Sequence, residues 1–284
     1  MSETTLAGSY TLRMNLFVKD TTFVAFDIET TGLTPVMDRI IEIGAVKCLN
    51  RKTIDTFQAL IDPGVPIPAE VSAINGITDD MVKGRETIDD VLPKFISFLE
   101  ESVAVAHNAP FDVGFIYYDL GRLGLKTSNK TILDTYAMTK QLFPHFHNYK
   151  LDSLVLNMHI KSETLHRALA DAEACMKIFY KCLDKLGDYE RLTIQDIMGI
   201  SGNAISFKGE ELISNGTFDP LKKALTQGVP IEIVYRDIKG ISTTRLITPF
   251  MVEMTQETIM IDAFCHLRRE KRRFRLDRIV KLKL

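Results

Sequence analysis

The sequence has 284 residues, which at about 150 residues per domain predicts two domains. Hydrophobic residues make up 45% and charged residues 25%, an ordinary composition for a globular protein. The sequence shows no apolar run of the roughly 18 residues that a membrane span needs, and no early apolar stretch typical of a signal peptide. We therefore expect a cytoplasmic protein with no membrane partner.

The charge is unevenly distributed along the chain. The whole sequence has 35 Lys and Arg against 37 Asp and Glu, but residues 219–284 alone hold 14 basic and 8 acidic residues. An acidic body joined to a basic module indicates a smaller part that faces a polyanion. The alternative is an ordinary solvated surface, which the charge alone leaves open.

The first two thirds of the sequence predict an α/β fold. Apolar, β-rich runs at 22–28, 40–48 and 53–61 indicate three strands. After a turn-rich stretch, we predict helices over 88–99, 111–123, 135–142, 151–156 and 168–186, and short strands at 103–106 and 131–133. Three leading strands followed by this alternation predict helices packed on a mixed sheet.

The remaining residues predict a linker and a second, smaller domain. Residues 187–216 lose the periodicity and contain several glycines, so we predict a linker there. A short helix over 220–226 then precedes β-rich runs at 231–235, 244–254, 258–264 and 273–282. The expected organisation is an N-terminal extension over 1–19, an α/β domain over 20–186, the linker, and a β-rich domain over 217–284.

Two acids lie at the end of the first predicted strand, in the run FDIETTG at 26–32. Asp27 and Glu29 are two residues apart, so their side chains point to the same face of the strand. Two adjacent carboxylates repel each other and are costly to desolvate, and a divalent cation removes both penalties. The pair therefore favours a metal site; the alternative is that either acid turns to solvent at the strand end.

Two later motifs place an acid near the start of a predicted helix. HNAPFD at 107–112 puts Asp112 in a first helical turn, just after a strand end where open α/β sheets bind ligands. A helix dipole also favours an acid there, so a capping role is the alternative. LHRALADA at 165–172 places His166 five residues before Asp171. Histidine suits general-base catalysis near neutral pH, although a single histidine is more often structural.

Together, FDIETTG, HNAPFD and HRALADA resemble the three motifs of the DEDDh 3′→5′ exonucleases. This RNase H-like group includes the proofreading epsilon subunit of bacterial DNA polymerase III. The resemblance covers residues 20–186 and extends to Asn75-Gly76-Ile77-Thr78. The related DEDDy group has tyrosine four residues before the last acid, where this chain has Arg167. The resemblance implies a five-stranded mixed sheet flanked by helices, and a metal-dependent 3′→5′ exonuclease that releases nucleoside monophosphates from single strands or 3′ ends of DNA.

The resemblance also implies the role of each motif residue. Asp27, Glu29, Asp112 and Asp171 would bind two divalent cations, Mg²⁺ or Mn²⁺. Asp27 would bridge both ions, Glu29 and Asp171 would hold the first ion, and Asp112 would hold the second largely through water. His166 would be the general base that takes a proton from the attacking water.

Residues around these motifs are expected to contact the substrate. By the same resemblance, Thr30, Thr31 and Leu33 grip the terminal nucleotide, with Leu33 wedged against the last base. We also predict substrate contacts for Asn108 and Phe111 of the second motif.

The C-terminal residues combine basic and apolar side chains in alternation. Residues 265–284 hold nine Lys and Arg against two acids. This pattern predicts a strand with one packed face and one cationic face that binds phosphates by releasing counterions. The candidate nucleic-acid contacts are Arg268, Arg273, Arg275 and Arg278. The alternative is a solvated edge strand whose charges prevent aggregation.

Residues 217–284 also resemble a WYL domain, a small β-rich module of bacterial regulators. The resemblance rests on residues 231–235, Arg245 with Pro249, the run AFCHLR at 263–268 and the run FRLDRI at 274–279. The Trp-Tyr-Leu that names the family reads Ile259-Met260-Ile261 here. The family implies a ligand that is single-stranded nucleic acid or a nucleotide-like molecule.

Two alternatives to a DNA exonuclease stay open at this point. An RNA 3′→5′ exonuclease would use the same chemistry, and the sequence does not show how a 2′-hydroxyl would be received. A non-catalytic nucleic-acid-binding regulator would keep the fold as a scaffold, although the complete set of acids argues against it.

Overall fold

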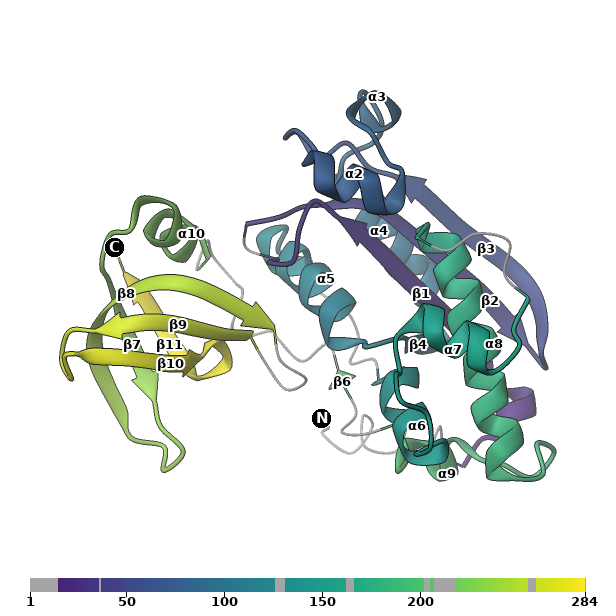
Figure 1. Cartoon of the computed structure of the whole chain (residues 1–284). Helices are drawn as coiled ribbons and strands as arrows, with labels where there is room; N and C mark the ends of the chain where they lie inside the picture. The colour runs from purple at the N-terminus through teal and green to yellow at the C-terminus, as the bar shows by residue number, and fades with distance from the viewer. Residues whose placement is uncertain are drawn as a thin grey trace, which may run out of the picture.

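The structure, a computed structural model, describes residues 15–35, 37–125, 131–161, 166–201, 205–206, 218–254 and 259–283. Within these residues the chain forms two separate sheets (Figure 1). Helices cover the larger sheet, whereas the smaller sheet has its own hydrophobic core. Among the described helices, none has the length and apolar character needed to span a membrane.

The larger sheet is mixed, with the strand order β3-β2-β1-β4-β5-β6. β4 and β5 run parallel to β1, while β2, β3 and β6 pair antiparallel with their neighbours. The strands are β1 (Thr22–Thr30), β2 (Ile40–Leu49), β3 (Lys52–Leu60), β4 (Val103–Ala106), β5 (Thr131–Asp134) and β6 (Ile205–Ser206). The first five are the predicted strands, so the predicted fold class is confirmed. The short β6 adds a sixth strand at one edge.

Helices pack on both faces of this sheet. They are α2 (Ala69–Asn75), α3 (Asp79–Val82), α4 (Ile88–Leu99), α5 (Pro110–Arg122), α6 (Thr135–Leu142), α7 (Leu151–Asn157), α8 (Ala168–Leu186) and α9 (Ile194–Met198). The helix α4 begins at a capping box formed by Thr87 and Asp90, and Asp134 caps α6 by accepting a hydrogen bond from the Tyr136 N–H. These local signals determine where the helices begin.

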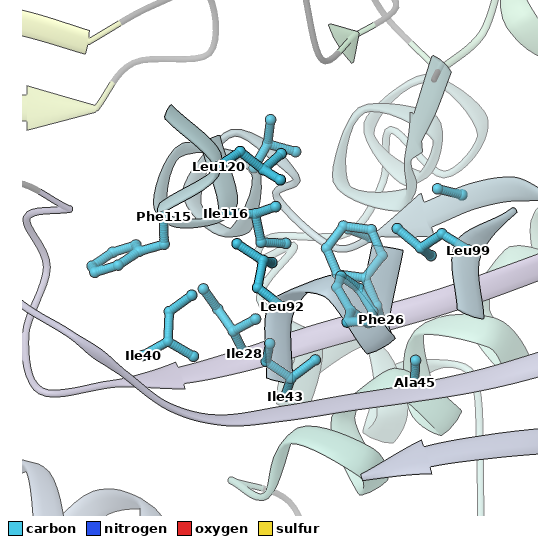
Figure 2. Packing of buried hydrophobic residues seen from close by; sticks show 14 of the residues in the cluster. Phe26, Ile28, Ile40, Ile43, Ala45, Leu92, Leu99, Phe115, Ile116 and Leu120 are labelled. Carbon is cyan, nitrogen blue, oxygen red and sulfur yellow. The ribbon is translucent and has the colours of Figure 1, made fainter. Parts of the chain in front are cut away.

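Alternating residues of β1 serve two different cores. Val24, Phe26 and Ile28 join the core under α4 and α5, shown in Figure 2. Phe23 and Ala25 join the core under α8, where the ring of Phe23 lies 4.9 Å from that of Phe179. Because side chains alternate between faces, Asp27 and Glu29 lie on the α8 face of the sheet.

Part of the predicted linker is structured. Ile194 and Ile197 of α9 are buried in the same core as α8, and Thr193 caps the helix. The segment also supplies β6, which pairs with β5. The predicted domain boundaries remain a prediction, but residues 187–201 pack as part of the larger domain. The helix α9 has only five residues, so the helical spacing of its Ile194, Ile197 and Met198 spans little more than one turn.

The smaller sheet is antiparallel throughout, with the order β10-β9-β8-β7-β11. Its elements are α10 (Phe218–Gln227), β7 (Ile231–Arg236), β8 (Ser242–Met254), β9 (Ile259–Cys265), β10 (Glu270–Arg275), the 3₁₀ turn η2 (Leu276–Arg278) and β11 (Ile279–Lys283). Only η2 joins β10 to β11, yet these strands lie at opposite ends of the hydrogen-bonded order. The sheet must therefore curl.

The prediction of one continuous strand over 273–282 was wrong. Phe274, Leu276 and Ile279 are all buried, at spacings of two and then three residues. A continuous strand would turn Ile279 to the outer face. The chain instead turns at η2, which places Arg278 in the turn and separates it from Arg273 and Arg275 on β10.

The helix α5 belongs to both parts of the molecule. Its Ile116 and Leu120 are buried against the larger sheet, whereas Tyr118 is buried in the core of the smaller one. Leu221 and Ala224 of α10 lie in that same core. One helix therefore connects the two hydrophobic cores directly.

The approach of α8 to β2 requires a glycine at position 44. A Cβ added to Gly44 would lie 2.1 Å from the backbone nitrogen of Leu169. We expect Gly44→Ala to lower the free energy of unfolding by about 1–3 kcal/mol or more, because backbone atoms of α8 would have to move. Urea unfolding followed by circular dichroism measures this. Gly199→Ala is the control, since no heavy atom lies within 4 Å of its added Cβ; equal losses in both variants would contradict the prediction.

Candidate active site

Three acids from two distant segments meet on the α8 face of the larger sheet. Asp27 and Glu29 come from the end of β1, and Asp171 comes from the first turn of α8. Each offers a carboxylate oxygen, and these oxygens all lie within 4.8 Å of one another. The structure therefore brings together three of the four predicted acids.

The fourth acid, Asp112, is held against the same strand. It lies in the first turn of α5, is almost completely buried, and its Oδ1 accepts a hydrogen bond of 3.1 Å from the Ile28 N–H. Asp112 is not part of the three-acid group, but its charge raises the pKa of Asp27. The role predicted for Asp112 at a second cation stays a prediction.

His166 lies directly beside Asp171. Its backbone N–H donates to both carboxylate oxygens of Asp171, at 3.2 Å each. The backbone of His166 has a positive φ of 67°, which is uncommon for a residue with a side chain. The imidazole is exposed to solvent. A strained backbone at this point holds an accessible imidazole next to the acids.

Burial raises the pKa of all four carboxyl groups. Desolvation raises the pKa of Glu29 to about 7 and that of Asp171 to about 6, although the hydrogen bonds that these carboxylates accept lower the pKa of each. Desolvation also raises the pKa of Asp27, and the charges of Asp112 and Asp171 raise it further; burial raises the pKa of Asp112 as well. Without a cation, these acids are costly to ionise together.

The donor set fits a divalent cation. All the converging ligand atoms are carboxylate oxygens, which hard ions such as Mg²⁺ and Mn²⁺ prefer over nitrogen or sulfur. A bound divalent charge would offset both the burial and the repulsion of the acids. Strongly shifted carboxyl groups at the end of a central strand indicate a functional site.

Asn75 is a site residue that we did not predict. Its Nδ2 donates to Glu29 Oε2 at 3.1 Å, and its Oδ1 accepts from the Ile77 N–H. Gly76 follows with a φ of 72°, so the helix α2 ends next to Glu29. The Asn-Gly pair in the sequence shows that the chain turns here, but not that the amide faces Glu29.

The loop after β1 uses its hydroxyl groups for its own structure. The Thr30 hydroxyl donates to the Gly32 carbonyl, and Thr31 Oγ1 accepts from the Arg39 N–H at 3.0 Å. Both threonines are buried, whereas Leu33 is 79% exposed. The nucleotide contacts of these three residues remain a prediction. Of the three, only Leu33 exposes most of its side chain to solvent.

The second motif has one exposed and one packed candidate. Asn108 is exposed with a φ of 57°, and its N–H donates to Asp134 Oδ1 at 2.9 Å. Phe111 is half-buried and packs on Phe115. The neighbouring His107 contacts Thr135 and the Tyr149 carbonyl through its two ring nitrogens, and burial lowers its pKa to about 4. His107 therefore has a structural role.

The four candidate arginines of the smaller domain do not share one strand. Arg273 donates to both carboxylate oxygens of Asp262, at 2.9 and 3.0 Å. Arg268 is exposed between β9 and β10, while Arg275 and Arg278 are half-buried. Their contacts with nucleic acid remain a prediction, and Arg273 would have to share its guanidinium with Asp262.

An aromatic and basic surface crosses β8, β9 and β10. We call Phe250, Phe264, His266 and Lys271 the outer aromatic face. Lys271 is the cross-strand partner of Phe264, and its Nζ lies 5.4 Å from the ring centre of Phe250. The rings of Phe264 and His266 lie 5.3 Å apart, and both phenylalanines are partly exposed. The sequence did not predict this surface, because its residues come from separate strands and are not neighbours along the chain.

Two family models match this chain, one over the region of the larger sheet and one over the region of the smaller sheet. A family model described as Exonuclease matches residues 24–179. The chain belongs to the exonuclease family. A second model, described as WYL domain, matches residues 216–284 and covers the smaller sheet.

Relatives of this chain include much longer proteins. It is 44% identical over 178 residues to the DNA polymerase III PolC-type of Caldanaerobacter subterraneus, and 40% identical over 182 residues to that of Listeria monocytogenes. These matches cover 63% and 64% of this chain but 13% of each relative. The chain therefore corresponds to a small part of these polymerases.

Solved structures also resemble this chain. Exonuclease X, solved in complex with 5′ overhanging duplex DNA, is 26% identical with a TM-score of 0.51, covering 63% of this chain and 99% of that one. E. coli exonuclease I, solved with a dT13 oligonucleotide, has a TM-score of 0.53 at 16% identity, covering 86% of this chain and 55% of that one. The second likeness shows the fold alone.

The raised carboxyl pKa values predict a pH-dependent instability without metal. Because the folded protein holds the Glu29 proton up to about pH 7 and the unfolded chain releases it near 4.5, stability falls as pH rises between these values. We expect Glu29→Gln to be more stable than wild type by about 1–2 kcal/mol at pH 8 in EDTA, and no more stable at pH 4. Denaturant unfolding at both pH values measures this.

The matched control is Glu173→Gln, which removes an exposed carboxylate from α8. This variant should unfold like the wild type at both pH values. A Glu29→Gln protein that is less stable than wild type at pH 8 would contradict the predicted cost of burying the ionised Glu29 carboxylate.

Proposed function

We propose that this chain is a metal-dependent 3′→5′ exonuclease that hydrolyses phosphodiester bonds of DNA and releases nucleoside monophosphates. The observation that carries the proposal is the convergence of Asp27, Glu29 and Asp171 with accessible His166 beside them. DNA as the substrate is supported by the polymerase relatives and by the duplex DNA bound to exonuclease X.

The acids divide between two cation positions in this proposal. Glu29 and Asp171 would hold one divalent cation, Asp112 would hold the other largely through water, and Asp27 would contribute to both positions. When bound, Mg²⁺ or Mn²⁺ stabilises the negative charge that develops on the attacking and leaving oxygens. Asn75 keeps the Glu29 carboxylate in place through its amide hydrogen bond.

His166 acts as the general base. Its imidazole accepts the proton of the attacking water at a ring nitrogen, while its backbone N–H remains bonded to Asp171. The proposed base and a metal-binding acid are thus linked directly by a hydrogen bond. Leu33, exposed in the loop after β1, packs against the terminal base and places the last phosphodiester near the acids.

The WYL domain supplies a second contact with nucleic acid in this proposal. The outer aromatic face offers two partly exposed rings for base stacking, with Lys271 beside them for phosphates. Arg268, exposed in the neighbouring turn, extends the positive charge. These features suit a single strand or a nucleotide, even though the Trp-Tyr pair of the family is replaced by Ile259-Met260.

The nuclease proposal is tested with 5′-labelled DNA and RNA strands in Mg²⁺ or Mn²⁺. We expect stepwise shortening of DNA from the 3′ end, no cleavage when the 3′ end is blocked, and no activity in Asp27→Ala. His166→Ala should lower kcat about 10²–10⁴-fold, because the general base is lost.

Other outcomes of the same assay would change the assignment. Faster shortening of RNA than of DNA would make the protein an RNA exonuclease. Wild type and Asp27→Ala that are equally inert, yet both bind DNA, would indicate a non-catalytic regulator. Cleavage of a strand with a blocked 3′ end would contradict the proposed direction.

The outer aromatic face is tested by single-strand binding in EDTA. We expect the double variant Phe264→Ala/Lys271→Ala to bind a short oligonucleotide about tenfold more weakly, since a stacked base contributes about 1–3 kcal/mol. Fluorescence anisotropy measures the affinity. Ile238→Ala, which removes an 83% exposed side chain between β7 and β8, is the control. Equal affinities of the two variants would contradict this binding face.

A further inference from the structure

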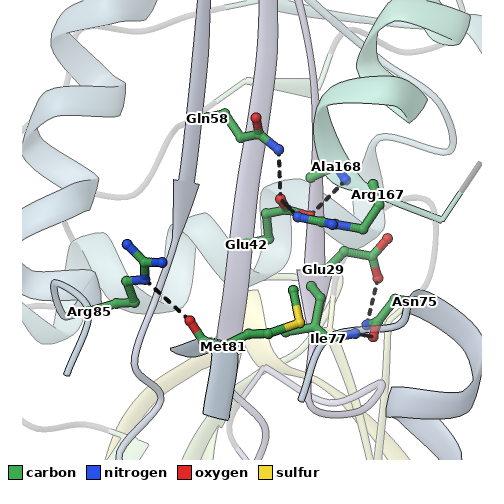
Figure 3. A network of polar contacts seen from close by, with 9 residues as sticks. All are labelled: Glu29, Glu42, Gln58, Asn75, Ile77, Met81, Arg85, Arg167 and Ala168. Atoms are coloured by element: carbon green, nitrogen blue, oxygen red, sulfur yellow. Dashed lines mark hydrogen bonds and ion pairs between the residues drawn. The ribbon is translucent and has the colours of Figure 1, made fainter. Parts of the chain in front are cut away.

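We propose that Glu42 and Arg167 form a clamp that positions Asp171 and His166 for catalysis. This inference rests on the proposed exonuclease function and adds two positioning residues to it. Neither residue belongs to the three-acid group, and Arg167 lies where the related tyrosine group has its tyrosine. Figure 3 shows the clamp and its neighbours.

Glu42 is a buried carboxylate with all of its oxygens engaged. It lies in β2 and is fully buried. Its Oε1 accepts from Arg167 Nη2 at 2.8 Å and from Gln58 Nε2 at 3.0 Å. Its Oε2 accepts from Arg167 Nε and from the Ala168 N–H, both at 3.0 Å. A two-pronged guanidinium contact fixes orientation as well as distance.

The clamp acts at the position of the metal-binding acids. In the pairing of β1 with β2, Glu42 lies opposite Glu29, and Gly44 lies opposite Asp27. Directly paired residues share a face, so Glu42 and Gly44 form the surface that receives the start of α8. The missing Cβ of Gly44 lets the backbone of Leu169 approach closely. The two β2 residues thus place the first turn of α8 relative to both acids of β1.

Arg167 links the Glu42 anchor to His166 and Asp171. It is the residue between His166 and the first residue of α8. His166 holds an uncommon backbone conformation, and its N–H is bonded to Asp171. Such a conformation persists only where the surroundings hold it. Anchoring Arg167 on Glu42 therefore sets both the His166 imidazole and the Asp171 carboxylate.

The rest of α8 is held by other contacts. Phe179 and Cys182 are buried in the core, and Asp184 near the end of the helix forms an ion pair with Arg51. Loss of the clamp should therefore loosen the first turn and the His166 loop without detaching the helix. Replacing both partners of a buried ion pair is often neutral for stability, whereas removing one partner is destabilising because the other charge stays buried. Comparison of Arg167→Gln with the variant that also carries Glu42→Gln therefore separates positioning from stability.

Arg51 offers a matched control for Arg167. Each arginine forms an ion pair that anchors one end of α8, Arg167 with Glu42 of β2 and Arg51, in the turn between β2 and β3, with Asp184. The side chains of Arg51 and Arg167 are 35% and 34% exposed, but Asp184 is 51% exposed whereas Glu42 is fully buried. Arg51→Gln removes the ion pair far from the acids, and Arg167→Gln removes the one beside them. Any effect of helix anchoring in general should appear in both variants.

The experiment measures kcat, KM and Mn²⁺ affinity of the full chain. We expect Arg167→Gln to lower kcat about 10–100-fold, the range known for groups that orient metal ligands, with KM for DNA changed less than about threefold. Arg167→Lys, which keeps the charge and one contact, should recover part of kcat. Isothermal calorimetry in the absence of DNA should show weaker Mn²⁺ binding in Arg167→Gln and unchanged binding in Arg51→Gln.

A double variant tests whether the two residues act as one unit. Glu42→Gln combined with Arg167→Gln should lower kcat no further than Arg167→Gln alone. Additive losses would overturn the clamp, as would equal losses of kcat and Mn²⁺ affinity in Arg167→Gln and Arg51→Gln. An inert wild type would instead refute the exonuclease function, and the Mn²⁺ affinities of the two arginine variants would then decide the clamp separately.

Discussion

The burial of neighbouring carboxylates is the constraint that organises this protein. Asp27, Glu29, Asp112 and Asp171 have raised pKa values chiefly because the fold removes them from water, and nearby acidic charges add to this effect. A rigid scaffold must oppose this cost. The central position of β1, with hydrogen-bonded strands on both sides, and the partial positive charge of the first turns of α5 and α8 provide that opposition.

Two helices connect the acids to the rest of the molecule. The helix α5 presents Asp112 at its start and buries Tyr118 in the core of the WYL domain. The helix α8 presents Asp171 at its start and is bound through arginine contacts at both ends, by Arg167 and Arg51. The position of each acid therefore depends on packing that extends well beyond the site.

In the WYL domain, the tertiary structure decides which basic side chains are available for binding. Its surplus of basic residues is real, but Arg273 is paired with Asp262 and Arg278 lies in a turn. The surface that combines cation and aromatic groups forms instead where Phe250, Phe264 and Lys271 meet across three strands. Charge composition indicated a polyanion partner, whereas cross-strand pairing decides which side chains are available to bind it.

The sequence alone determined the features that depend on local geometry. Strand alternation places Asp27 and Glu29 on one face, and capping and spacing place Asp112 and Asp171 in first helical turns. Only the tertiary structure decided the contact between Glu42 and Arg167, which are 125 residues apart, the amide of Asn75 on Glu29, and the break at Leu276. These contacts depend on strand register and on how closely a helix approaches a sheet, and neither quantity is encoded by neighbouring residues.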